Sequence, residues 1–228
     1  MQNNAAPNAI PDRTPQRVRH ELRMRLLEVR SVESLTPHMV RVTLCGNDLF
    51  PNPETGELAL PQIGAEGVAK PAPGDAPRLM RDYTPRQYDA ATKTLVIDFA
   101  MHESGPATQW ARTAKPGDRI GVGGPRGSFV IPMNFDGYVL IGDDTALPAM
   151  ARRLTELPAG ALVFVFAEVD SPADRLRFAS NADVVVEWIY REGKPAGEST
   201  ALLDALQVAT LPSGDIALKD AGLLSRSI

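Results

Sequence analysis

An antiparallel Greek-key β-barrel followed by a doubly wound parallel α/β domain is the fold that this sequence of 228 residues predicts. Up to about Phe135, short runs of alternating hydrophobicity are separated by clusters of proline and glycine. After Phe135, continuous apolar runs alternate with segments of helical spacing, the βαβ order of a parallel sheet. We therefore expect domains at 20–134 and 135–228, after a disordered lead-in over 1–19.

Short strands make up the expected barrel. Apolar and polar side chains alternate in 40–45 and in 95–100, as in strands with one buried face. Further candidate strands are 22–30, 79–84, 119–122 and 128–131. The stretch 52–78 is rich in proline, glycine and alanine, so we expect a long loop there.

The second region predicts three buried strands at 138–141, 161–167 and 183–188. Helical spacing appears in 145–157, which ends at a Pro-Ala-Gly sequence, and again in 199–206. A cleft between two such domains is a usual place for a ligand.

The composition argues against several classes of function. A net charge of -4 gives no reason to expect nucleic-acid binding, and no apolar run approaches the length of a membrane span. The first fifteen residues lack the apolar core of a secretory signal. Cys45 is the only cysteine, which suits a reducing cytoplasm, and the three histidines lack the spacing of a zinc helix. We therefore expect no metal held by the protein itself, and any chemistry would need a borrowed cofactor.

In the segment 81–86, the aromatic ring of Tyr83 lies between the guanidinium groups of Arg81 and Arg86 in the sequence. A ring offers a stacking surface, and arginines offer forked donors that match phosphate oxygens. The Thr84 hydroxyl could hydrogen-bond a ring nitrogen. The alternative is an edge strand with solvated arginines and a packed tyrosine.

A second segment predicts a helix that begins at Gly105-Pro106 and ends at Lys115-Pro116-Gly117. The free amides of Ala107 and Thr108 would then form an anion site at the positive end of the helix. The alternative is a short connecting helix whose Trp110 fills the core.

These segments resemble a known family. Arg81, Tyr83, Thr84 and Arg86 resemble the flavin signature of the ferredoxin-reductase superfamily. Several further segments are similar to the siderophore-interacting proteins: 97–102, 105–107, 110–111, 116–118, 124–128 and 142–149. The resemblance extends from about Arg23 to about Asp215.

The resemblance implies FAD on the barrel, with Tyr83 and Thr84 as the catalytic pair. Tyr83 would stack on the isoalloxazine, Thr84 would lie near its reactive edge, and Arg81 or Arg86 would bind the pyrophosphate. The resemblance also implies further cofactor contacts from Asp98, His102, Gly105, Ala107 and Thr108. For His102, a strand-end histidine with satisfied hydrogen bonds is the alternative.

The turn at 142–148 occupies the strand-to-helix position where dinucleotides bind. It lacks the G-x-G-x-x-G pattern, and Asp143 and Asp144 place negative charge where a pyrophosphate would lie. The resemblance implies that NAD(P)H binds here with looser phosphate contacts, at Asp144, Thr145 and Ala146. Glu168 and Asp170 could bind ribose hydroxyls, whereas Arg175 and Arg177 could favour a 2′-phosphate; the choice between NADH and NADPH stays open.

The activity implied by the resemblance is electron transfer from NAD(P)H through FAD to Fe(III) in ferric siderophores, in a cytoplasmic monomer. Anionic siderophores favour a basic docking surface, with Arg126 and Lys70 as the expected substrate contacts and Arg78 and Lys115 as weaker candidates. Relatives continue after Asp215 with a further strand, a helix and a basic tail, so a shortened second domain is expected here. The alternatives are a flavin reductase with another acceptor, a ferredoxin-type partner among them, and a non-catalytic flavin or siderophore-binding module.

Overall fold

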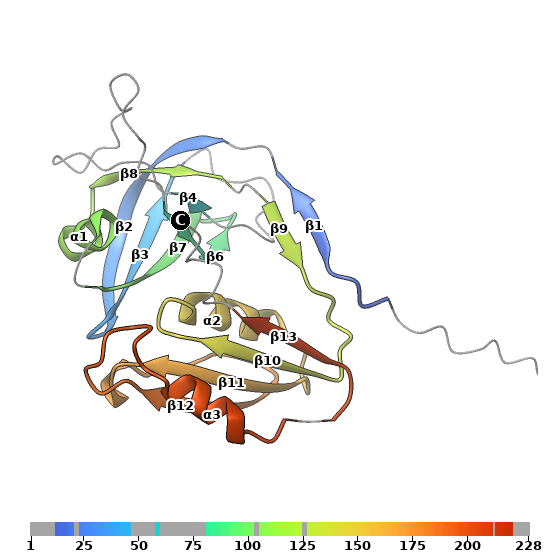
Figure 1. The fold of residues 1–228 in the computed structure, drawn as a ribbon. Helices are drawn as coiled ribbons and strands as arrows, with labels where there is room; N and C mark the ends of the chain where they lie inside the picture. Colours follow the sequence, from blue (N-terminus) through green and yellow to red (C-terminus); the bar gives the residue numbers. More distant parts are fainter. Residues whose placement is uncertain are drawn as a thin grey trace, which may run out of the picture.

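The computed structural model describes residues 12–20, 23–46, 58–59, 81–102, 105–124, 127–211 and 213–220. Within these ranges both predicted regions are present (Figure 1). A curled antiparallel sheet is followed by a parallel sheet with helices, so the predicted fold class is confirmed.

The first sheet has the strand order β5-β4-β8-β2-β3-β7-β6. Its strands are β2 (Met24–Thr36), β3 (Met39–Cys45), β4 (Leu58–Ala59), β5 (Asp82–Tyr83), β6 (Pro85–Asp89), β7 (Thr94–Ala100) and β8 (Arg119–Gly123). β8 returns to lie beside β2, which gives the Greek-key order β8-β2-β3-β7. Only Thr84 separates the two edge strands β5 and β6, so the sheet must curl until its edges meet.

Two local predictions in this region differ from the structure. Of the strand expected at 79–84, residues 79–80 lie outside the described residues and β5 covers Asp82–Tyr83, while the separate strand β6 begins at Pro85. The expected lead-in also contains a strand, β1 (Gln16–Arg19), which pairs antiparallel with β9 (Gly127–Val130). All four residues of β1 are exposed, so its sequence shows no buried face; the pairing with a distant strand decides its conformation.

The second sheet is parallel throughout, with the order β12-β11-β10-β13. Its strands are β10 (Gly137–Gly142), β11 (Leu162–Val169), β12 (Asp183–Tyr190) and β13 (Ile216–Asp220). β13 corrects the expectation that the chain lacks a strand after Asp215, because Ile216 pairs with Gly137 and the strand continues along β10.

Helices cover both faces of this sheet. α2 (Leu147–Glu156) lies between the sheet and the barrel, α3 (Ala201–Val208) lies on the other face, and a single turn, η1 (Pro172–Asp174), follows β11 (Figure 1). Met39 at the start of β3 belongs to the same buried cluster as Leu147 and Met150 of α2, so the two regions share a core at their junction. Among the described residues, no helix is long and apolar enough to cross a membrane.

Candidate functional site

Tyr83 lies at the closure of the barrel, at the end of β5. Its ring packs on Phe99 with a centroid distance of 4.6 Å, and Phe99 in turn packs on Trp110 at 5.6 Å. Phe99 is fully buried, so it fixes the position of both neighbouring rings. The two segments singled out in the sequence, around Tyr83 and around Trp110, are therefore joined by one line of aromatic contacts.

Helix α1 (Pro106–Thr113) begins as predicted, with Gly105 as its N-cap and Pro106 in its first turn. Gly105 has φ 143° and ψ 142°, a conformation open to glycine and costly for residues with a Cβ. Among the described residues, no side chain caps this helix start, and the first-turn amides of an α-helix have no partner within the helix. Trp110 is 6% exposed and anchors the helix in the barrel core, so the core-filling alternative and the helix-start prediction both hold.

These residues fit a flavin nucleotide. A half-buried tyrosine ring supplies a flat platform, and the uncapped start of α1 supplies amide donors for phosphate. The indole Nε1 of Trp110 is buried without a hydrogen-bond partner, a donor that this part of the structure leaves unsatisfied. The two segments that would hold the ring and the phosphates are thus fixed to one another through Phe99.

Burial raises the pKa of the Tyr83 hydroxyl to about 12, although the charge of Arg81 acts in the opposite direction. We predict that Tyr83 stays a neutral phenol throughout the physiological range. The folded-state pKa lies above the ordinary value of about 10. The neutral phenol therefore makes its full contribution to the free energy of unfolding below about pH 10. This contribution is lost as the pH rises toward 12. The measurement is an ultraviolet pH titration of wild type and of Tyr83→Phe, in which the difference between the two curves reports the ionisation of Tyr83. A midpoint at the ordinary tyrosine value would contradict the prediction.

Arg86 lies in β6, three residues after Tyr83. Burial lowers the pKa of its guanidinium; the charges of Asp98 and Glu156 offset part of that effect, and those of Arg41 and Arg152 add to it. Asp98 is 2% exposed and accepts two hydrogen bonds from Arg41, at 2.7 Å from Nε and 2.8 Å from Nη2. The cofactor roles of Arg86 and Asp98 stay predictions; the structure places both residues in a charge cluster where the barrel meets α2.

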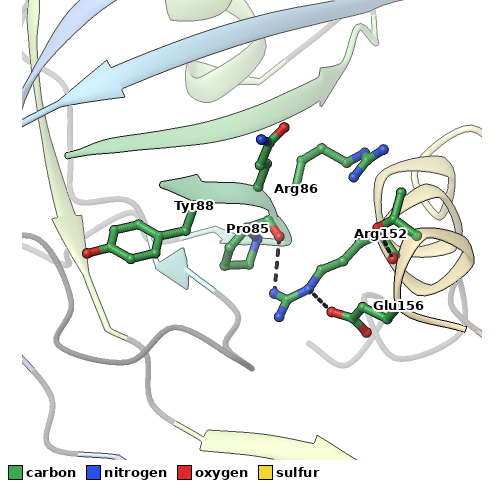
Figure 2. Close-up of a pocket in the computed structure, with 7 residues that line it drawn as sticks. Pro85, Arg86, Tyr88, Arg152 and Glu156 are labelled. Atoms are coloured by element: carbon green, nitrogen blue, oxygen red, sulfur yellow. Dashed lines mark hydrogen bonds and ion pairs between the residues drawn. The ribbon is translucent and has the colours of Figure 1, made fainter. Parts of the chain in front are cut away.

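A cavity of about 280 Å³ opens beside this cluster (Figure 2). Its lining consists of Pro85, Arg86, Gln87, Tyr88, Arg152, Thr155 and Glu156. Arg152 of α2 donates to the carbonyl oxygen of Pro85 at 3.1 Å and to Glu156 at 2.7 Å, which ties the helix to β6. Arg41 and Arg152 were not singled out from the sequence, since an arginine beside apolar neighbours on a strand or helix looks like an ordinary solvated charge.

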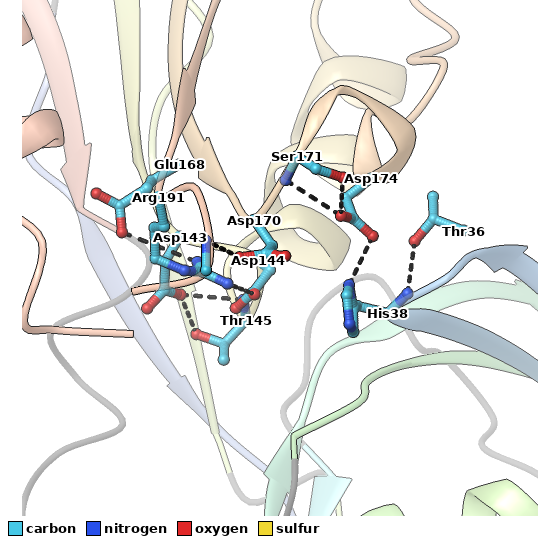
Figure 3. A network of polar contacts seen from close by, with 11 residues as sticks. Thr36, His38, Asp143, Asp144, Thr145, Glu168, Asp170, Ser171, Asp174 and Arg191 are labelled. Carbon is cyan, nitrogen blue, oxygen red and sulfur yellow. Dashed lines mark hydrogen bonds and ion pairs between the residues drawn. The ribbon is translucent and has the colours of Figure 1, made fainter. Parts of the chain in front are cut away.

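The turn between β10 and α2 carries the acidic pair, and the structure shows what balances it (Figure 3). Arg191, directly after β12, donates to Asp144 at 2.6 Å, and its other terminal nitrogen lies 3.8 Å from Glu168. All three are less than a tenth exposed. Burial alone would lower the pKa of Arg191, but the hydrogen bond and charge of Asp144, with the charge of Glu168, raise it overall. Asp143 accepts a hydrogen bond from the Thr145 amide at 3.0 Å.

This pairing changes the predictions for the second domain. Arg191 pairs with Asp144 and lies near Glu168, and Ala146 is fully buried, while the cofactor contacts of these residues stay predictions. Thr145 is exposed, at the carboxyl edge of the sheet. Asp170 accepts from the Gly193 amide at 3.0 Å. The sequence signal for Arg191 was its place at the end of a buried strand, the position where ligand-facing residues gather.

The remaining predicted residues are placed as follows. Thr84 is half-buried between β5 and β6, and Thr108 is 6% exposed in the first turn of α1. The carbonyl oxygen of His102 accepts from Arg112 at 3.1 Å. Arg175 lies over the Tyr190 ring at 5.2 Å, and Arg177 and Lys115 are exposed. Lys70, Arg78 and Arg126 lie outside the described residues.

Two family models match this chain. Residues 48–129 match the family model described as siderophore-interacting FAD-binding domain, and residues 135–218 match the model described as siderophore-interacting protein. The boundary between the matches falls close to the predicted domain boundary at 134–135.

Among characterised relatives, the NADPH-dependent ferric-chelate reductase of Escherichia coli is 38% identical over 64% of this chain. The chain spans 61% of that enzyme's length. The ferric vibriobactin reductase of Vibrio cholerae is 32% identical over 83% of this chain and 74% of its own length. A siderophore utilization protein from T. fusca has a crystal structure that is 38% identical, covers 91% of this chain and 84% of its own, and superposes with a TM-score of 0.82.

Proposed function

Because this chain belongs to the siderophore-interacting protein family, we propose that it is an FAD-dependent reductase that passes electrons from NAD(P)H to Fe(III) in ferric siderophores. Siderophores hold Fe(III) far better than Fe(II), so reduction releases the iron. The observation that carries the proposal is the aromatic line from Tyr83 through Phe99 to Trp110, which joins a ring platform to an uncapped helix start.

The barrel residues hold and orient the cofactor. Tyr83 would offer its ring to the isoalloxazine, and the amides of Ala107 and Thr108 would take phosphate oxygens. Arg81 lies close enough to Tyr83 to affect its pKa and would bind the pyrophosphate. Thr84, next in sequence to Tyr83, would hydrogen-bond the flavin ring. The chemistry that bound FAD would supply is acceptance of a hydride and delivery of single electrons to Fe(III).

The carboxyl edge of the parallel sheet receives the nicotinamide donor. Arg191 neutralises Asp144, and the Thr145 amide engages Asp143, so the acidic turn presents less negative charge than its sequence suggests. This removes the main objection to a dinucleotide at the β10–α2 turn. We place the siderophore at Arg126 and Lys70 on the grounds of charge, and the protein as a monomer in the reducing cytoplasm.

A stopped-flow experiment tests the activity. Purified protein loaded with FAD is reduced anaerobically with NADPH, and ferric dicitrate or a ferric catecholate siderophore is then added. We expect the visible flavin band to bleach and then return, with Fe(II) captured by a ferrous chelator. A bleached flavin that ferric siderophore fails to reoxidise would point to another acceptor; a flavin that a reduced ferredoxin bleaches and NADPH does not would identify a ferredoxin-type donor.

Gly105 supplies a test of the phosphate site. A Cβ at this position would meet only the Thr108 hydroxyl oxygen, at 3.8 Å, so Gly105→Ala adds no clash. Its cost lies in the positive φ, of the order of 1–3 kcal/mol. We expect the helix start to shift and FAD affinity to fall roughly tenfold, measured by flavin fluorescence. Gly160→Ala, also at positive φ with nothing within 4 Å but remote from the barrel, is the matched control and should leave FAD affinity unchanged.

A further inference from the structure

The turn between β2 and β3 brings a histidine of the barrel against two carboxylates of the second domain (Figure 3). Nδ1 of His38 lies 2.9 Å from Oδ1 of Asp174, which ends η1. Asp170, at the end of β11, completes the group. One ligand atom from each residue lies within 4.8 Å of the other two.

Each carboxylate is oriented by other hydrogen bonds. Oδ2 of Asp174 accepts from the backbone amide of Ser171 at 3.2 Å and from its hydroxyl at 2.9 Å, which leaves Oδ1 directed at His38. Oδ1 of Asp170 accepts from the Gly193 amide at 3.0 Å. Such outer contacts fix ligand direction at metal sites, where they are nearly as important as the ligands.

The charges of this group are poorly balanced. Among the described residues, no lysine or arginine forms an ion pair with Asp170 or Asp174, while Arg191 is committed to Asp144 and Glu168. Two carboxylates beside one imidazole therefore carry an excess of negative charge that a cation would remove. The His38 side chain is 45% exposed, so solvent ions can reach it.

We propose that His38, Asp170 and Asp174 bind a divalent first-row transition cation that bridges the barrel and the parallel-sheet domain. One imidazole nitrogen and two carboxylate oxygens form a ligand set that suits Zn²⁺, Mn²⁺ or Fe²⁺, with the remaining positions left to water. Ligand distances near 2.1 Å place neighbouring ligand atoms about 3 Å apart in an octahedral site and about 3.4 Å apart in a tetrahedral one. The observed separation of His38 and Asp174 is 2.9 Å. Because the ligands come from both domains, the cation would stabilise their junction.

The test is a calorimetric titration of EDTA-treated full-length protein with Zn²⁺ and, separately, with Mn²⁺. We expect saturation at a single site and a rise in Tm on binding. His38→Ala and Asp170→Asn should each weaken the affinity by about 100-fold, since each removes one ligand, and should abolish the rise in Tm. Asp174 is left intact because it also caps η1.

His20→Ala is the matched control, since the His20 ring bonds to Ser128 at 2.8 Å within the barrel. It should keep wild-type affinity. The proposal is overturned if wild type binds neither cation, if His38→Ala and Asp170→Asn bind as tightly as wild type, or if His20→Ala loses affinity equally. If wild type binds no cation and His38→Ala has a lower Tm than wild type, the contact between His38 and Asp174 is only a hydrogen bond between the domains. No FAD or siderophore is needed, so the outcome is independent of the reductase activity.

Discussion

Replacing Arg191 with methionine is expected to lower the free energy of unfolding by about 3–5 kcal/mol. The guanidinium is the cation that compensates Asp144 and Glu168, and all three side chains are less than a tenth exposed. Methionine fills a similar volume, so the loss comes from the carboxylates left buried without a partner. Urea denaturation followed by circular dichroism gives the free energy directly.

Arg177→Met is the matched control for this prediction. Arg177 is exposed, and its loss should change stability by about 0.5 kcal/mol or less. The double variant Arg191→Met/Asp144→Leu removes the nearer carboxylate as well and should recover part of the stability, because an apolar pair can replace a buried ion pair. A loss in Arg191→Met no larger than in Arg177→Met would mean that Arg191 is not the compensating charge.

Replacing Tyr83 with alanine is expected to weaken FAD binding by about 2 kcal/mol, or roughly 30-fold in Kd. The variant loses the stacking surface and also the ring that packs on Phe99 at 4.6 Å, so the platform itself becomes loose. The purified protein should be nearly colourless. Fluorescence titration of FAD into the protein freed of its cofactor measures the change.

Two further variants separate the causes. Tyr83→Phe keeps the ring and should bind FAD within about threefold of wild type, since only one hydroxyl contact is lost. Arg86→Ala should leave FAD affinity intact and lower Tm, because Arg86 lies with Asp98, Arg41 and Arg152 at the junction with α2. If Tyr83→Ala binds FAD as tightly as Tyr83→Phe, the ring is not the platform. If Arg86→Ala loses FAD, the predicted pyrophosphate role of Arg86 is supported.

Local patterns in the sequence determined the architecture. Alternation in β3 and β7, the continuous apolar runs of β10 and β11, and the Gly105-Pro106 helix start each depend on a few neighbouring residues. Backbone sterics and side-chain periodicity act over that range, so these elements could be predicted. The same holds for Tyr83, whose neighbours on the strand already marked it as a ring platform.

Long-range pairing decided the rest. β1 finds its partner in β9, and β13 joins the parallel sheet beside β10, although neither strand has a strong pattern of its own. The strand β6 begins at Pro85 only because the barrel closes there.

The tertiary structure above all decided which partners the charged side chains have. Asp98 meets Arg41 across 57 positions, Asp144 meets Arg191 across 47, and His38 meets Asp174 across 136. A sequence shows that an acidic residue is present, but its function depends on which cation the fold places beside it. Burial then makes that pairing obligatory, because an uncompensated charge inside a protein costs several kcal/mol. The sequence therefore predicted the antiparallel and parallel sheets and pointed to Tyr83 as a flavin platform, and the fold decided which charged residues pair with one another.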